Sequence, residues 1–279
     1  HASFDVALFK NRGYAVSLAA ISLSFFALTG ITFMLPFYLQ ILRGFDPLSA
    51  GLSFIPFAVG QIIAAPRSAT MANRFGYRAV MSFGLGAVAA ALGALSLIQI
   101  DTPIWLILIV FFIFGFGLGN VIAPASTVMQ NVLPLARAGA GSAVQNTVRQ
   151  VGGALGVAVI GTILATRYAQ NVEPFLGRLP VEISDQAKDV ASESIIGTVS
   201  VLDQAAESGV PASIIDQLQS GAFEAFLNAS HITSMISTAV VLIAFFTVLL
   251  GLPKIYPPQK IKIEEPNQVP DPKPDKSAK

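Results

Sequence analysis

Six long apolar windows are the dominant feature of this sequence. They lie at about 15–41, 49–70, 79–99, 104–127, 143–165 and 231–252. Crossing the roughly 30 Å of hydrocarbon in a bilayer takes about 20 helical residues at about 1.5 Å each, and each window is long enough. Backbone polar groups cannot be hydrated in hydrocarbon, and the sequence lacks the alternating strands typical of a membrane barrel. The windows therefore predict an all-α integral membrane protein with six spans.

Charged residues are scarce outside a few segments. They make up 12% of the sequence, against about 25% in a typical soluble domain, whereas hydrophobic residues make up 53%. The net charge of +1 gives no field that attracts nucleic acid, and a chain with no Cys and two His has little for a metal site. The windows contain no nucleophile–base pair and no set of acidic or His ligands. We therefore expect no enzymatic activity, no cofactor, no metal and no nucleic-acid partner.

The basic residues predict the orientation, because cytoplasmic loops of membrane proteins carry an excess of Lys and Arg. With spans that alternate in direction, one side receives eight basic residues: Lys10, Arg12, Arg74, Arg78, Arg137, Lys254, Lys260 and Lys262. The other side receives residues 166–230, which hold nine acidic and three basic residues. We expect a protein of the plasma membrane (in bacteria, the cytoplasmic membrane), with both ends of this chain in the cytoplasm.

This orientation divides the chain into four segments. Residues 1–165 are expected to form a five-helix membrane segment. Residues 166–230 are expected to form an acidic outer loop with short amphipathic helices near 184–206 and 211–229. Residues 231–252 are the expected sixth membrane helix, and 253–279 a disordered cytoplasmic tail. The sequence begins at His1 without a signal peptide, which favours a fragment of a longer chain.

Two pairs of glycines are candidates for close helix packing. Gly115 and Gly119 lie in the fourth window, and Gly152 and Gly156 lie in the fifth. Lipid provides no hydrophobic drive between helices, so small residues that let backbones approach are common at helix contacts. The same faces would suit helices that slide against each other during transport, and the sequence alone leaves both interpretations open.

Polar side chains inside the windows are costly in hydrocarbon and must face protein or water. The candidates are Gln61, Asn120, Gln145, Asn146 and Arg149. Gln145 and Arg149 share one helix face because they are four residues apart. Arg149 is either a structural side chain that reaches toward the membrane surface or a partner of another helix in an ion pair or gate. No window contains Asp or Glu, so a carboxylate that carries protons would have to lie outside this chain.

Several motifs follow one another in the order of a known family. They are Leu35-Pro36-Phe37-Tyr38-Leu39-Gln40, Gly115-Phe116-Gly117-Leu118-Gly119, Pro124, Pro134, Asn146 and Arg149-Gln150-Val151-Gly152-Gly153-Ala154-Leu155-Gly156. This set resembles the C-terminal half of the fourteen-helix drug/proton antiporters of the EmrB/QacA type, in the major facilitator superfamily. The resemblance covers nearly the whole chain except the tail.

The resemblance implies both a fold and a function. The fold would be a six-helix half of a major facilitator transporter, made of two inverted three-helix repeats with a long outer loop. The function would be export of lipophilic or cationic drugs and biocides in exchange for protons. The implied partners are the lipid bilayer, the small substrate, protons and an N-terminal half of six to eight helices. A lipid exporter on the same fold and a half that assembles without transporting are alternatives.

Residues 66–78 resemble a second copy of the cytoplasmic loop motif of the superfamily. Arg74, Gly76 and Arg78 match the motif, whereas Asn73 stands in place of its Asp. The resemblance implies a cytoplasmic gate in which the two Arg side chains hydrogen-bond to helix ends. A simpler interpretation is that they anchor the positive side of the protein.

A substrate pathway between two such halves needs an apolar, aromatic surface if the substrate is a lipophilic cation. Phe33, Phe37 and Tyr38 in the first window are the candidate aromatic residues. The candidate polar groups of the pathway are Gln61, Asn120, Gln145, Asn146 and Arg149. Each of these residues also has a simpler interpretation as a lipid-facing or helix-packing side chain.

Overall fold

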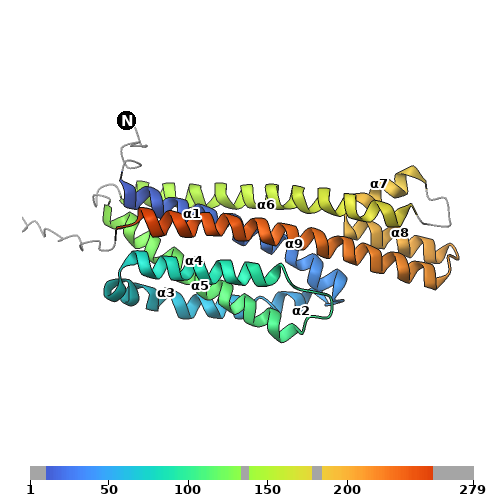
Figure 1. Ribbon diagram of the computed structural model, residues 1–279, viewed down its shortest axis with the longest axis horizontal. Coiled ribbons are helices and arrows are strands. Elements are labelled where there is room, and N and C mark those ends of the chain that lie inside the picture. The colour runs from blue at the N-terminus through green and yellow to red at the C-terminus, as the bar shows by residue number, and fades with distance from the viewer. Residues whose placement is uncertain (1–10, 133–137, 178–183, 254–279) are drawn as a thin grey trace, which may run out of the picture.

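The computed structural model describes residues 11–132, 138–177 and 184–253, and these residues are almost entirely helical (Figure 1). The helices are α1 (Arg12–Phe37), the short π-helix η2 (Tyr38–Leu42), α2 (Pro47–Leu52), α3 (Ile55–Phe75), α4 (Tyr77–Leu95), α5 (Ile104–Val132), α6 (Ala138–Leu176), α7 (Asp185–Glu193), α8 (Ile195–Glu207) and α9 (Ala212–Gly251). Six helical stretches are long and apolar enough to cross a membrane: Arg12–Leu42, Pro47–Phe75, Tyr77–Leu95, Ile104–Val132, Gly139–Leu176 and Ala212–Gly251. The predicted all-α fold with six spans is confirmed.

Two of these helices are much longer than their apolar windows. α6 has 39 residues and α9 has 40, which is about 60 Å each and about twice the hydrocarbon thickness. Figure 1 shows them side by side, extending past the ends of the other spans. The short helix expected near 211–229 is therefore continuous with the sixth span. Its buried face, which includes Leu218, Ala222 and Phe226, continues directly into the face that includes Thr233 and Ser237.

The helix expected near 184–206 is two helices instead of one. Ser194 is extended, with φ −162°, and its side chain accepts a hydrogen bond from the backbone N–H of Gly197 at 3.1 Å, which starts α8. Such a cap satisfies a backbone donor that the helix itself leaves unpaired. The tail expected at 253–279 lies outside the described residues except for Pro253. Of the basic residues used to predict the orientation, five also lie outside them: Lys10, Arg137, Lys254, Lys260 and Lys262.

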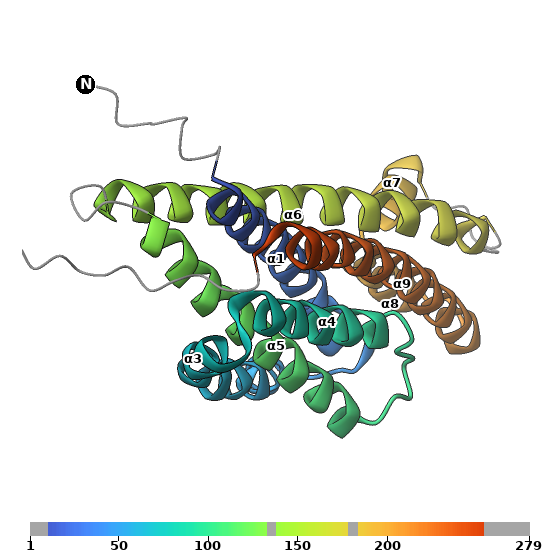
Figure 2. The ribbon, with the colours of Figure 1, turned by 60° about the vertical axis from the view of Figure 1, so that its left-hand side comes forward.

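The spans form two layers. One layer has the order α3, α5, α1, α6, because α3 packs on α5, α5 on α1 and α1 on α6, while α4 and α9 cover one side of it. Figure 2 shows α6 and α3 at opposite edges of this arrangement. The two three-helix repeats would be α1, α3, α4 and α5, α6, α9. The first helix of one repeat, α1, packs against the second helix of the other, α6, and likewise α5 packs against α3. Two inverted repeats produce this arrangement.

Glycines allow helix backbones to approach closely where α5 crosses α3 and where α6 crosses α1. A Cβ atom at Gly115 would collide with the backbone of Phe57 on α3, and one at Gly119 would lie 2.7 Å from the Cβ of Ala64. On α6, a Cβ at Gly152 or Gly156 would collide with the backbone of α1. The four glycines named from the sequence thus lie where α5 crosses α3 and where α6 crosses α1.

Replacing Gly115 by Ala should destabilise the bundle, because its new Cβ has only backbone to displace. We expect a loss of about 1–3 kcal/mol in the free energy of unfolding, seen as a lower midpoint of thermal unfolding in detergent. Gly93→Ala is the matched control, since nothing lies within 4 Å of a Cβ at Gly93 and Ala stabilises a helix by about 0.5–1 kcal/mol relative to Gly. Equal midpoints for the two variants would contradict this packing.

Candidate functional site

The contact between α1 and α6, called here the α1–α6 seam, brings together most of the substrate-pathway residues expected from the sequence. The two helices run in the same direction, because Phe25 lies beside Arg149, Thr29 beside Gly153 and Phe33 beside Gly161. The hydroxyl of Thr29 donates a hydrogen bond to the carbonyl of Gly153 at 2.8 Å, and this bond joins the helices midway along the seam. A polar cluster and an aromatic pocket lie on either side of this point.

The polar cluster consists of Phe25, Ser126, Gln145 and Arg149, at the meeting point of α1, α5 and α6. The guanidinium carbon of Arg149 lies 4.5 Å from the ring centroid of Phe25, a cation–π geometry. Nε2 of Gln145 donates a hydrogen bond to Oγ of Ser126 at 2.5 Å. Nε of Arg149 is buried and has no hydrogen-bond partner among the described residues. Arg149 as a whole is only half-buried, so the rest of its guanidinium can donate hydrogen bonds to a carboxylate or another acceptor from outside this chain.

Asn146 lies beside this cluster but faces outward from α6. It belongs to a stripe of exposed polar and small residues at four-residue intervals: Ser142, Asn146, Gln150, Ala154 and Ala158. A neighbouring part of the exposed surface is purely apolar and consists of Val151, Leu155 and Val159. The exposed polar side chains thus end at Gln150, and the exposed side chains from Val151 to Val159 are all apolar, including Val157 on the face of the stripe. Of the six spans, those of α3 and α6 are the least covered, with 22% and 28% of their most apolar window buried.

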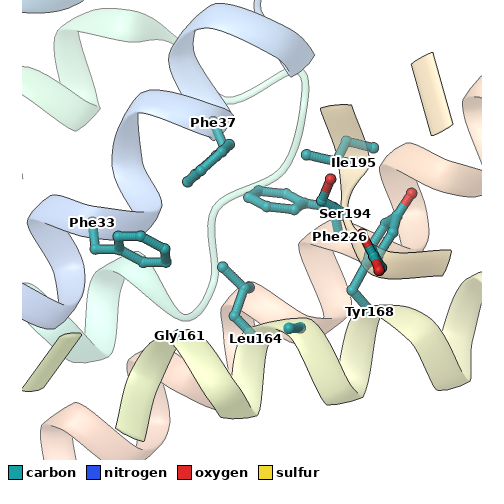
Figure 3. A pocket seen from close by; sticks show the side chains of 10 residues that line it. Phe33, Phe37, Gly161, Leu164, Tyr168, Ser194, Ile195 and Phe226 are labelled. Carbon is teal, nitrogen blue, oxygen red and sulfur yellow. The ribbon is translucent and has the colours of Figure 1, made fainter. Parts of the chain in front are cut away.

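The aromatic pocket lies on the other side of Thr29. Phe33 and Phe37 of α1 form one wall, with ring centroids 5.6 Å apart, and Phe37 lies 6.4 Å from the ring of Phe226 on α9 (Figure 3). The other residues that line the pocket come from α6, α7, α8 and the junction between α7 and α8: Gly161, Leu164, Ala165, Tyr168, Glu193, Ser194 and Ile195. Phe33 and Phe37 were expected from the sequence as pathway residues. Tyr168, Glu193 and Phe226 were not, because they fall in the segment interpreted as an outer loop.

Three further pathway candidates lie apart from the seam. Tyr38 is completely buried, and its hydroxyl donates a hydrogen bond to the carbonyl of Gln99 at 2.8 Å. Asn120 is 1% exposed, and its amide nitrogen donates to the carbonyl of Phe116 on its own helix at 2.9 Å. Gln61 is half-buried on α3 where that helix crosses α5. Tyr38 and Asn120 are enclosed by helices of this chain, so they line no surface that a substrate could reach in this conformation.

The four residues expected at a cytoplasmic gate all lie at the turn between α3 and α4, but they differ in exposure. Gly76 forms the turn between α3 and α4, with φ +88°, a conformation that favours Gly. Asn73 and Arg74 are exposed at the end of α3, where the guanidinium of Arg74 lies 5.3 Å from the neighbouring ring of Phe75. Arg78 is half-buried and lines a pocket with Arg12 and the last residues of α9. A cation near a helix C-terminus is stabilised by the helix dipole, so Arg78 suits a role in holding this end of α9.

Near the aromatic pocket, polar side-chain contacts join α6 to α8 and to α9. The hydroxyls of Tyr168 and Thr198 lie 2.5 Å apart, and Thr198 also donates to the carbonyl of Ala191 at 2.6 Å. The side-chain amide of Asn171 donates to the carbonyl of Ala225 at 3.4 Å. The two contacts of Thr198 hold α8 over the aromatic pocket. Within the described ranges, no group of three or more His, Asp or Glu side chains is arranged to hold a metal ion.

Tyr168→Phe removes one of these contacts without changing the packing of the ring. We expect α8 to open more often, with hydrogen exchange in residues 195–207 faster by about fivefold, because a net hydrogen bond is worth about 1 kcal/mol. Exchange measured by mass spectrometry checks this. Thr162→Val, on an exposed position of the same helix, is the control and should leave exchange unchanged. Identical exchange in both variants would mean that the Tyr168 hydroxyl does not hold α8.

Comparisons with known proteins agree with this architecture. The family model of the Major Facilitator Superfamily matches residues 3–157, more than half of the chain. The chain is 31% identical over 240 residues to the multidrug efflux pump LfrA of Mycolicibacterium smegmatis, a match that covers 86% of this chain and 46% of that protein. It is 32% identical over 175 residues to the multidrug resistance protein Stp of Mycobacterium tuberculosis, covering 62% and 32%.

A third relative comes from another genus. The tetracenomycin C resistance and export protein of Streptomyces glaucescens is 27% identical over 202 residues, which is 70% of this chain and 38% of that protein. The chain therefore spans between about a third and a half of the length of these relatives. From the six spans, their paired-repeat packing and the match of the family model, the chain is an integral membrane protein that belongs to the Major Facilitator Superfamily.

Proposed function

We propose that this chain is the C-terminal half of a plasma-membrane transporter that exports lipophilic cations in exchange for protons. The names of the relatives, a multidrug efflux pump and two proteins of resistance or export, support a drug exporter. Both ends of this chain would lie in the cytoplasm, as the distribution of basic residues indicates. The N-terminal half would pack against α3 and α6, the two spans that this chain covers least.

The polar stripe of α6 is the observation that carries this proposal. Asn146 and Gln150 are exposed within a span, where an uncovered amide is costly against lipid. Ala154 and Ala158 continue the stripe with small side chains that let another helix approach closely. The stripe is therefore suited to another helical half or to a water-filled pathway. The adjacent apolar face, with Val151 and Leu155, is suited to lipid.

Arg149 would link this half to the other. Its guanidinium is held over Phe25 on one side, and its Nε has no hydrogen-bond partner among the described residues. The acidic residues described on α6 and α9 (Glu173, Asp216 and Glu224) lie outside the apolar windows. The carboxylate that carries the proton would therefore belong to the N-terminal half, and Arg149 could respond to its charge. A change of protonation there would then change the packing of the two halves.

Arg149→Ala in the complete transporter should abolish export while leaving the amount of protein in the membrane normal. The reason is the loss of the charge through which the two halves would interact. Efflux of a fluorescent cationic dye from cells measures the activity, and immunoblotting of membranes measures the protein. Arg167→Ala is the matched control because Arg167 is an exposed Arg on the same helix. Undiminished efflux by Arg149→Ala would remove the gating role.

The orientation can be tested with single cysteines, since the sequence has none of its own. Asn73 and Glu207 are exposed at the two ends of the bundle, so the test variants are Asn73→Cys and Glu207→Cys. In intact cells, a membrane-impermeant maleimide should label Glu207→Cys strongly. Asn73→Cys should be labelled only after the cells are permeabilised. The reverse pattern would contradict the proposed orientation.

A further inference from the structure

The aromatic pocket has the dimensions of a site for a single ring. Its cavity volume is about 120 Å³, and an apolar cavity of about 150 Å³ in another protein is known to take up benzene. The rings of Phe33 and Phe37 meet edge to face at 65°, and that of Phe226 is tilted by 53° to Phe37. Figure 3 shows these three rings around one space above Leu164. The pocket can therefore offer both ring faces and ring edges to an aromatic guest.

The charged side chain that lines the pocket is acidic. Glu193 lines the pocket, and no Lys, Arg or His lines it among the residues that the structure describes. A second hollow shares Phe37 and contains Asp203 of α8, and its described lining residues include no basic one. Arg167 and Lys188 are the bases on neighbouring turns, and neither lines either hollow. The C-terminus of α7 meets the N-terminus of α8 at Ser194, so their opposite partial charges largely offset each other.

The pocket is also preformed. Gly161 makes room for Phe33, since a Cβ at that position would lie 3.3 Å from its ring. At Gly197 a Cβ would collide with the carbonyl of Val190, so the α7–α8 pair closes tightly only with Gly there. Together with the Tyr168–Thr198 contact, these features fix the walls before any ligand arrives. A rigid site loses less entropy when a ligand binds.

From this combination of rings, size and charge, we propose that the pocket binds the aromatic ring of a monovalent lipophilic cation. The cationic group lies beside the exposed carboxylate of Glu193. Aromatic faces attract a desolvated cation, and a carboxylate adds an opposite charge. This inference rests on the proposed function, because it makes the pocket a station for such substrates at the outer end of the α1–α6 seam. The ligand class is an aryl group one or two bonds from a quaternary or tertiary ammonium.

Direct binding tests this assignment without transport. The probe is 4-fluorobenzyltrimethylammonium, followed by fluorine NMR, with the purified chain in nanodiscs of phosphatidylcholine, which carries no net charge. We expect saturable binding, about fivefold weaker in Glu193→Gln and in Phe37→Ala. Ala165→Trp should abolish binding, since Ala165 lines the pocket and a Trp ring there fills it. Circular dichroism confirms that each variant keeps its helices.

Glu207→Gln is the matched control. Glu207 is an exposed residue at the end of α8 and lines neither hollow, so this change removes the same charge at a distance from the pocket. Its affinity should stay within about twofold of the wild type. Absence of saturable binding, equal weakening by Glu193→Gln and Glu207→Gln, or full binding by Ala165→Trp would each overturn the assignment.

Dye export by the complete transporter separates this inference from the proposed function. If the wild type exports cations and the pocket variants keep both binding and export, the pocket assignment is wrong and the proposed function stands. If the chain binds the probe as expected but the complete transporter exports no cation, the pocket is supported and the proposed function is wrong.

Discussion

The structure depends on one constraint, the close approach of helix backbones at glycine. In lipid no hydrophobic drive brings helices together, so contact area and interhelical hydrogen bonds must do so. Gly115 and Gly119 provide this approach between α5 and α3, and Gly152 and Gly156 provide it between α6 and α1. Because both pairs cross in this way, each repeat is held by a helix of the other. The α1–α6 seam is therefore a closely packed contact.

That seam joins two sites of different chemistry. Arg149 over Phe25 lies on one side of its midpoint, and the pocket between Phe33, Phe37 and Phe226 lies on the other. Both sites are built on the same two helices, so a tilt of α6 against α1 would change both together. This is a physical route by which an event at Arg149 could alter the aromatic pocket. It requires only that the two helices move as rigid bodies.

The six spans and the packing glycines were predictable, because length, hydropathy and small-residue spacing follow directly from the properties of lipid. The extensions of α6 and α9 were not, since acidic residues such as Glu173 and Glu224 resemble a loop when their tertiary partners are unknown. For the same reason Phe226 and Tyr168 were missed. Tyr38 and Asn120 look like pathway residues in the sequence, yet they face helices of their own chain. Periodicity does not reveal which partner covers a polar face.

The central claim is that another helical half covers the polar stripe of α6. Photo-crosslinking in the complete transporter tests it, with benzoylphenylalanine placed at Gln150 on the stripe and, separately, at Leu155 on the adjacent apolar face. Mass spectrometry then identifies what each probe has bonded to. The account predicts protein adducts at Gln150, to a segment outside this chain, and lipid adducts at Leu155. Lipid adducts alone at Gln150 would contradict it.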